Sequence, residues 1–209
     1  MLLFDHPATP STRRARMFAA EKQLDITKRS VDLAAREQLG DEFLALNPRG
    51  TVPVLLTDNG DALSENLAIA VYLEAIEPAP NLLGATANEK ASIAMWGAIC
   101  EQHGFAAISE SVRNASPTLV DRALPGPIAF AQLPELVERG KRRVEVFFAM
   151  LDEQLAGHDY LARASFSYAD LTAFAAVDFA YSAELTHPAQ YPAVHRWHQR
   201  VAARPSAAA

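Results

Sequence analysis

A proline-rich segment divides the chain into two parts with different secondary-structure patterns. The segment Glu77-Pro78-Ala79-Pro80-Asn81 interrupts a helical pattern, and proline-rich stretches of this kind mark linkers. Before it, short apolar runs alternate with helical patterns, whereas after it the strand signals fade. We therefore predict an α/β N-terminal domain at residues 1–78, a linker at 79–87 and an all-α C-terminal domain at 88–209.

The N-terminal part has the predicted element order β-α-β-α-β-β-α. Asn59-Gly60 is a favoured hairpin turn, so the strands on either side of it should pair antiparallel. Ser64 is a favoured N-cap and should begin a helix that runs to about Glu77. The earlier predicted elements are a strand at 2–5, a helix at 11–24, a weaker strand at 26–33 and a short helix at 41–46.

Two capping boxes organise the predicted helices of the C-terminal part. Thr86 and Glu89 should begin a long helix that reaches about Arg113. Ser167 and Asp170 precede a mostly apolar stretch, which predicts a central helix buried on most of its sides. A last helix should open at residue 192.

Composition and charge exclude several functions. The formal net charge of -6 argues against nucleic acid as a partner, and the basic runs at 13–16 and 141–143 are expected to be solvated helix faces. A single cysteine, Cys100, excludes a disulfide framework and a thiolate-rich zinc site, and we expect no metal. No apolar run approaches the roughly 18–20 residues that span a bilayer, and no signal peptide is recognisable. We therefore expect a cytoplasmic protein without a membrane partner.

The segment Thr9-Pro10-Ser11-Thr12 is the first candidate site, because it joins a predicted strand to a predicted helix. Free N–H groups and the helix dipole favour an anion at a helix start. A thiol held there should lose its proton more readily, and a hydroxyl that donates to the sulfur adds to this effect. The alternative is an ordinary helix cap.

Two further segments offer main-chain and charged groups to a ligand. If Pro53 is cis, the N–H and C=O of Val52 could pair with an extended peptide as an added strand does. Backbone N–H groups around Ser64-Glu65-Asn66 suit a carboxylate, and Glu65 can hold an ammonium group. A trans proline and an ordinary capping sequence are the alternatives.

These motifs resemble the signature of cytosolic glutathione transferases. The signature is Asn-Pro-x-Gly-x-Val-Pro followed by Glu-Ser-x-Ala-Ile, and the chain has similar residues at 47–55 and 64–69. The capping box at 167–170 and the tail at 191–205 also resemble the family, so the likeness spans the whole chain. It implies a thioredoxin-like N-terminal domain with Pro53 cis, a helical C-terminal domain, and a homodimer. It also implies glutathione as co-substrate and a small hydrophobic electrophile in the cleft between the domains.

The resemblance also assigns roles to individual residues. Thr9 lies where serine-type and cysteine-type members keep their catalytic residue, and Ser11 is the near alternative. Val52 would pair with the cysteinyl part of glutathione, Glu65 and Asn66 would hold the γ-glutamyl end, and Gln38 would contact the glycyl carboxylate.

The chain departs from the family in ways that leave its reaction open. Asn66 replaces the usual serine, no tyrosine precedes Tyr72, and no cysteine occurs at 9–12. Thr9-Pro10 resembles the bacterial nu-like group, whose members favour disulfide or peroxide reduction. Transfer of glutathione to an electrophile is the expected function, with a glutathione-dependent reductase and a non-catalytic binding protein of the same fold as alternatives.

Overall fold

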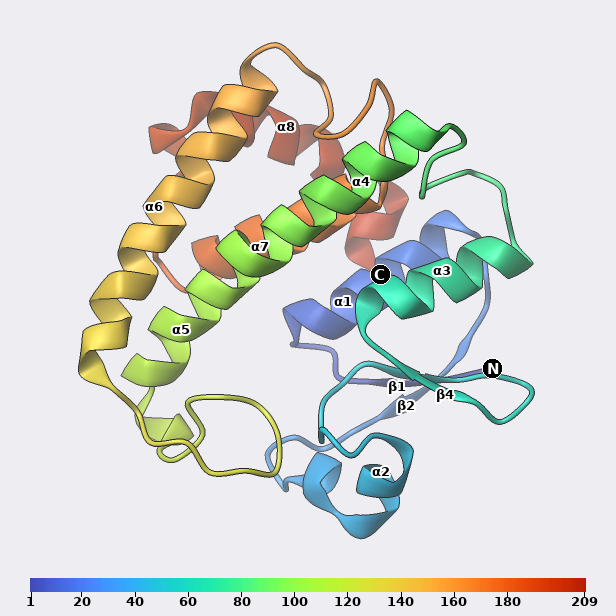
Figure 1. The fold of residues 1–209 in the computed structure, drawn as a ribbon, viewed down its shortest axis with the longest axis vertical. Coiled ribbons are helices and arrows are strands. Elements are labelled where there is room, and N and C mark those ends of the chain that lie inside the picture. Colours follow the sequence, from blue (N-terminus) through green and yellow to red (C-terminus); the bar gives the residue numbers. More distant parts are fainter.

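The computed structural model describes residues 1–209, and its single sheet of four strands belongs to the N-terminal part of the chain (Figure 1). The N-terminal elements are β1 (Leu2–Asp5), α1 (Pro10–Glu21), β2 (Thr27–Ser30), η1 (Glu37–Leu39), α2 (Asp41–Leu46), β3 (Val54–Leu56), β4 (Ala62–Ser64) and α3 (Asn66–Ile76). The elements that follow are α4 (Ala87–Ile99), the π-helical η2 (Cys100–Phe105), α5 (Ala106–Ala115), η3 (Pro117–Leu119), α6 (Pro134–Ala156), α7 (Tyr168–Ser182), η4 (Pro188–Gln190), α8 (Pro192–Ala202) and η5 (Pro205–Ala208). The predicted fold class, an α/β part followed by an all-helical part, is therefore confirmed.

The sheet has the strand order β2-β1-β3-β4, with β1 parallel to β2 and the other pairs antiparallel. Successive side chains of a strand point to opposite faces. Leu3 and Leu55 therefore join the larger core on the α1 and α3 side, whereas Phe4 and Val54 pack with Phe43 of α2. Figure 1 shows the same division, with α2 below the sheet and α1 and α3 above it. The predicted hairpin between β3 and β4 is confirmed.

The prediction that Ser64 caps the following helix is wrong. Ser64 is the last residue of β4, where it lies opposite Val54 in the ladder. The helix α3 begins at Asn66, and Glu65 is its N-cap, with φ 73° and ψ 128° and no capping bond from its side chain. Serine is a good cap in isolation, but strand pairing holds this serine one residue too early.

The larger core continues without a break from the sheet into the helical part. Phe18 of α1 meets Tyr168 of α7 with ring centroids 6.2 Å apart, and both side chains are buried. Most of α7 is buried, and both predicted capping boxes are present, at Thr86 with Glu89 and at Ser167 with Asp170. No helix combines the length and the apolar character needed to cross a membrane.

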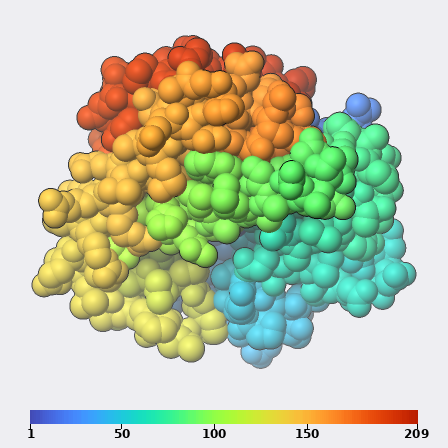
Figure 2. All heavy atoms as spheres, turned by 45° about the horizontal axis from the view of Figure 1, so that its top comes forward, coloured from blue at the N-terminus to red at the C-terminus, as the bar shows by residue number.

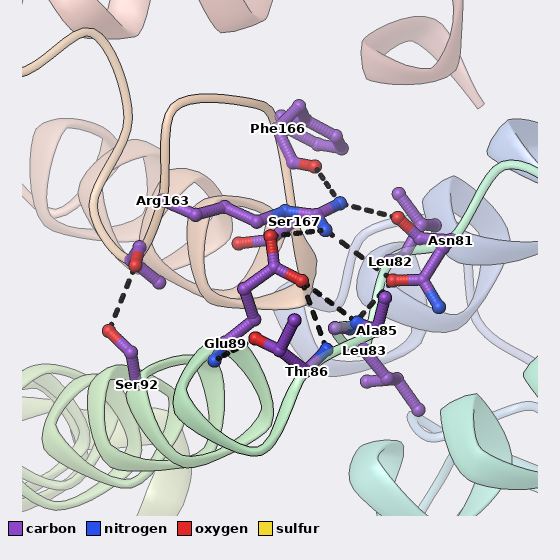
Figure 3. Close-up of polar contacts among 12 residues, drawn as sticks. Asn81, Leu82, Leu83, Ala85, Thr86, Glu89, Ser92, Arg163, Phe166 and Ser167 are labelled. Atoms are coloured by element: carbon purple, nitrogen blue, oxygen red, sulfur yellow. Dashed lines mark hydrogen bonds and ion pairs between the residues drawn. The ribbon is translucent and has the colours of Figure 1, made fainter.

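Hydrogen bonds with charged side chains fix the connection between α3 and α4 (Figure 3). Arg163, from the α6–α7 connection, donates to the main-chain oxygens of Asn81 and Phe166. Glu89 accepts from the N–H groups of Ala85 and Thr86, at 2.9 and 3.3 Å. These bonds fasten the segment before α4 to the segment before α7, which fixes the direction in which the helical part begins.

Candidate functional site

The strand register brings three connections to one edge of the sheet. Phe4 lies opposite Val54, and Val54 lies opposite Ser64. The end of β1, the start of β3 and the end of β4 are therefore neighbours. The segments attached there are the β1–α1 connection, the Val52–Pro53 peptide bond, which is cis, and the first residues of α3. Most of the predicted site residues lie in these three segments.

Side-chain contacts tie these connections together. Asn66 Nδ2 donates to Ser11 Oγ at 3.1 Å, which joins α3 to α1. Glu65 forms an exposed ion pair with Arg49, from the loop before β3. The main chain of Gln38 approaches the same loop, since a Cβ on Gly50 would lie 3.0 Å from the Gln38 carbonyl oxygen. The structure thus brings Gln38, Glu65 and Asn66 to the edge where β3 begins.

The hydroxyl of Thr9 is engaged within its own turn. Thr9 is the N-cap of α1, and its Oγ1 accepts from the Thr12 N–H at 3.2 Å. Thr12 donates its one hydroxyl hydrogen to the His6 carbonyl at 2.6 Å. In the 2.7 Å contact between the Thr9 and Thr12 hydroxyls, Thr9 is therefore the donor. Thr9 has no hydroxyl hydrogen left for a ligand while this turn is intact.

The hydroxyl of Ser11 differs from that of Thr9, because it accepts two hydrogen bonds from side chains of the chain. Its oxygen accepts from Asn66 Nδ2 at 3.1 Å and from an Arg14 Nη2 at 3.4 Å. A serine oxygen has two acceptor positions and one hydrogen. Because both acceptor positions are filled, the hydroxyl hydrogen is free to donate to a ligand atom. Ser11 also stands at the N-terminal end of α1, where the helix dipole favours an anion.

Three buried polar atoms at this site have no hydrogen-bond partner. They are Gln38 Oε1, Asn66 Oδ1 and Arg14 Nε. Leaving such an atom unpaired costs about 1–3 kcal/mol, so native structures rarely do so without a ligand or water. The two oxygens require donors, and the nitrogen requires an acceptor. A polar ligand with ammonium, amide and anionic groups fits this set.

The expectation that residues 13–16 form a solvated face is wrong for two of the three arginines. Arg14 and Arg16 are only 5% and 8% exposed. Arg16 pairs with Asp5 at 2.6 Å behind the β1–α1 connection. Arg14 is the site residue that the sequence reasoning missed, although it precedes the buried Phe18 by one helical turn and so shares its face.

A cleft of about 620 Å³ lies beside the β1–α1 connection. Its wall includes Thr9 and Pro10 and, from α7, Phe179. Asp178 lies in the same wall and binds both Arg13 and His198. Burial alone would raise the pKa of Asp178, but hydrogen bonds from His198 and Arg13 lower it below its usual value. The volume suits a small molecule.

A loop with exposed apolar side chains lies close to the loop that precedes β3. It joins α5 to α6 and exposes Leu124, Ile128 and Phe130. A Cβ on Gly126 of this loop would lie 3.1 Å from the Arg49 carbonyl oxygen. In Figure 2 the yellow surface of this loop adjoins the blue surface of the α2 region. The helical part therefore reaches over to the loop that precedes β3.

Neither the cysteine nor the acidic residues suggest other chemistry. Cys100 is fully buried, and burial raises the pKa of its thiol far above the ordinary value, which favours the expected packing role. No group of three or more His, Cys, Asp or Glu side chains is placed to hold a metal ion.

The mixed four-stranded sheet, the helix start at its edge and the attached helical part define a thioredoxin-like domain joined to a helical domain. Family models for the glutathione S-transferase N-terminal and C-terminal domains match residues 8–76 and 104–205. The chain belongs to the glutathione S-transferase family.

Relatives of known name agree with this assignment. Glutathione S-transferase 2 of Saccharomyces cerevisiae is 33% identical over 209 residues, which cover 99% of this chain and 87% of that protein. The crystal structure of Gtt2 from the same organism superposes with a TM-score of 0.90 at 32% identity, covering 99% of this chain and 98% of that chain. A sphingomonad glutathione S-transferase complexed with glutathione gives a TM-score of 0.80 at 28% identity, covering 99% and 94% of the two chains. The disulfide-bond oxidoreductase YfcG of Escherichia coli is 26% identical, over 95% of this chain and 88% of that protein.

Proposed function

We propose that this glutathione transferase holds the glutathione sulfur as a thiolate beside Ser11 and transfers it to a small hydrophobic electrophile. The observation that carries the proposal is the hydrogen-bond pattern of Ser11. Its oxygen accepts two hydrogen bonds, so its hydrogen remains for the sulfur. The family to which the chain belongs supports glutathione as the thiol.

Glutathione would lie along the edge of the sheet at the start of β3. The main chain of Val52, beside the cis Pro53, would pair with its cysteinyl part. Glu65 and Asn66 would hold the γ-glutamyl end, where the unpaired Asn66 Oδ1 suits the ammonium group. Gln38 would contact the glycyl end. Two of the residues assigned here, Gln38 and Asn66, carry side-chain oxygens that lack partners in the chain.

The reaction requires no covalent intermediate on the protein. The thiol proton of glutathione passes to solvent, and the Ser11 hydroxyl and the helix start stabilise the thiolate that remains. The sulfur then attacks an electrophilic carbon, and the leaving group departs with the electron pair of the bond that breaks. Holding both reactants together supplies much of the rate. The electrophile would occupy the cleft lined by Thr9 and Pro10, which directly precede Ser11 in the chain.

A glutathione-dependent reductase of disulfides or peroxides is the second candidate. The observations in its favour are the Thr9-Pro10 pair and the likeness to YfcG, which is named a disulfide-bond oxidoreductase. A reductase would need room for a second glutathione at the sulfur, whereas a transferase needs room for an apolar molecule there.

A cytoplasmic homodimer is part of the proposal. Leu67 and Val71 of α3 and Met95 of α4 are large apolar side chains that are 47%, 53% and 53% exposed. A second copy packed on α3 and α4 would cover them. The single buried cysteine suits a reducing compartment.

Calorimetry and two assays test this function. Titration with glutathione should give a dissociation constant in the millimolar range or below, and an aryl halide should be conjugated faster than a small disulfide is reduced. The opposite order of rates would favour the reductase. Absence of glutathione binding at millimolar concentration would leave a non-catalytic binding protein of this fold.

A further inference from the structure

Arg14 places a buried positive charge beside the proposed sulfur site. The residue is 5% exposed, on the first turns of α1. A buried guanidinium is unfavourable unless it is paired and hydrogen-bonded. The position of this arginine therefore requires partners, and it has them on both of its Nη atoms.

The two Nη atoms of Arg14 connect the two parts of the chain. Nη1 binds a carboxylate oxygen of Glu101, from η2 of the helical part, and Nη2 reaches Ser11 Oγ at 3.4 Å. The guanidinium also lies 4.1 Å from the ring centroid of Phe105. Its planar fork suits two simultaneous contacts of this kind, which an ammonium group cannot reproduce.

The π-helical turn of η2 supplies both Glu101 and Phe105. The N–H of Ala106 donates to the Glu101 carbonyl oxygen, five residues earlier, which is the hydrogen bond of a π-helix. Such turns occur often at functional sites because they widen the helix and shift the side chains that follow. Here the widened turn carries the two residues that contact Arg14.

Few other charges act on Arg14 from the surrounding elements. Burial raises the pKa of Tyr168 of α7 to about 12, and burial also raises the pKa of the Cys100 thiol. Both groups are therefore neutral at physiological pH. Glu101 is the ion-pair partner of Arg14, and its side chain is 43% exposed, so solvent screens its charge more than that of Arg14. Part of the positive charge of Arg14 therefore remains uncompensated near Ser11.

We propose that Arg14, held by Glu101 and Phe105 of the helical part, is a positioning residue that orients the Ser11 hydroxyl and keeps positive charge beside the glutathione sulfur. This inference rests on the proposed function. The unpaired Arg14 Nε, buried at the same place, is the donor that an anion or a bound water would meet.

The test is the thiol pKa of bound glutathione, measured from thiolate absorbance against pH. Arg14→Met keeps the apolar stem over Phe105 but removes the charge. We expect this variant to raise the thiol pKa by about one unit or more. At pH values below that raised pKa, the conjugation rate of the variant should be about tenfold lower than the wild-type rate. At pH values above it, the two rates should converge, because glutathione is then ionised even without the charge of Arg14. Glutathione affinity should change much less.

Arg204→Met is the matched control. Arg204 pairs with Glu21 at 2.7 Å and lies 4.1 Å from the Phe166 ring centroid, so it makes the same two kinds of contact far from Ser11. This variant should leave the thiol pKa unchanged. Arg14→Lys should give a smaller rise than Arg14→Met, about half a unit. If Arg14→Met does not fold, the thiol pKa measured with Arg14→Lys provides the test instead.

Failure of the proposed function and failure of the role given to Arg14 would give different results. If wild-type protein does not bind glutathione or lower its thiol pKa, the proposed function is wrong. If wild-type protein lowers that pKa and a folded Arg14→Met, or a folded Arg14→Lys where Arg14→Met does not fold, leaves it unchanged, the proposed function stands and the role given to Arg14 is overturned.

Discussion

The side-chain amide of Asn66 donates to the hydroxyl of Ser11 at 3.1 Å, and this bond joins the first turns of α3 and α1. The amide nitrogen of Asn66 is one of the two donors that fill the acceptor positions of the Ser11 hydroxyl oxygen. The other amide atom, Oδ1, is buried without a partner in the chain. In the proposed glutathione site, this one side chain would contact both the residue beside the sulfur and the γ-glutamyl end.

Asn66→Ala should weaken glutathione binding about tenfold or more, because a hydrogen bond to a charged group contributes about 1.5–3 kcal/mol. The variant should also raise the thiol pKa of bound glutathione, since Ser11 loses one of its donors. Calorimetry and thiolate titration measure the two effects. Asn88→Ala, at an exposed position of α4, is the control and should change neither.

Ser11→Ala and Thr9→Val should separate two hydroxyls that sequence alone leaves as alternatives. Ser11→Ala should raise the thiol pKa of bound glutathione and lower turnover, with little loss of stability. Thr9→Val should leave the thiol pKa unchanged and lower the free energy of unfolding by about 1 kcal/mol, as the loss of an N-cap does. A raised thiol pKa in Thr9→Val alone would transfer the role from Ser11 to Thr9.

Glu65→Gly should separate stability from binding. Glu65 has a φ of 73°, a conformation that costs a residue with a side chain about 1–3 kcal/mol. Glycine relieves this strain, so the free energy of unfolding should stay equal or rise by up to about 1 kcal/mol. Glutathione affinity should fall at least about tenfold, because the carboxylate is lost.

Glu153→Gly is the control for that substitution. Residue 153 lies at an exposed position inside α6, where glycine should lower the free energy of unfolding by about 1 kcal/mol. Urea unfolding measures both variants. A similar loss of stability in both would show that Glu65 is not strained.

Asp170 should make stability depend on pH in an unusual direction. Burial raises its pKa to about 6, and hydrogen bonds from Leu161, Ser167 and Trp197 only partly oppose this effect. The folded state therefore binds the proton more tightly than the unfolded state. Stability from this group should be fully present below about pH 4 and be lost as pH rises through about 6.

Asp170→Asn provides the comparison, because asparagine does not titrate. The difference in free energy of unfolding between wild type and variant, measured in urea, should narrow as pH rises from about 4 to about 7. A difference that widens over this range would mean that the donors around Asp170 outweigh its burial.

Local patterns predicted the elements well, and long-range pairing explains where they failed. The hairpin at Asn59-Gly60 and the box at Ser167 are set by neighbours in sequence, so both were predictable. Ser64 was misjudged because its pairing with Val54 is a property of the sheet. The expected division into residues 1–78, 79–87 and 88–209 stays a prediction.

The candidate site was predicted from motifs, but its hydrogen bonds were not. Which hydroxyl keeps a free hydrogen depends on the contact of Ser11 with Asn66, 55 residues away. The burial of Arg14 depends on Glu101, 87 residues away, so a run of basic residues could only indicate a solvated face. Residue type and spacing identify candidates, whereas three-dimensional neighbours decide their roles.

The unbroken core that passes from the sheet into α7 has a consequence for how the chain can be divided. Separating the two parts near residue 78 would leave Phe18 and its neighbours on α1 facing water, and would strip Arg14 of Glu101. The part that carries the sulfur site should then neither fold nor bind glutathione by itself. We therefore expect binding and catalysis to require both parts of the chain.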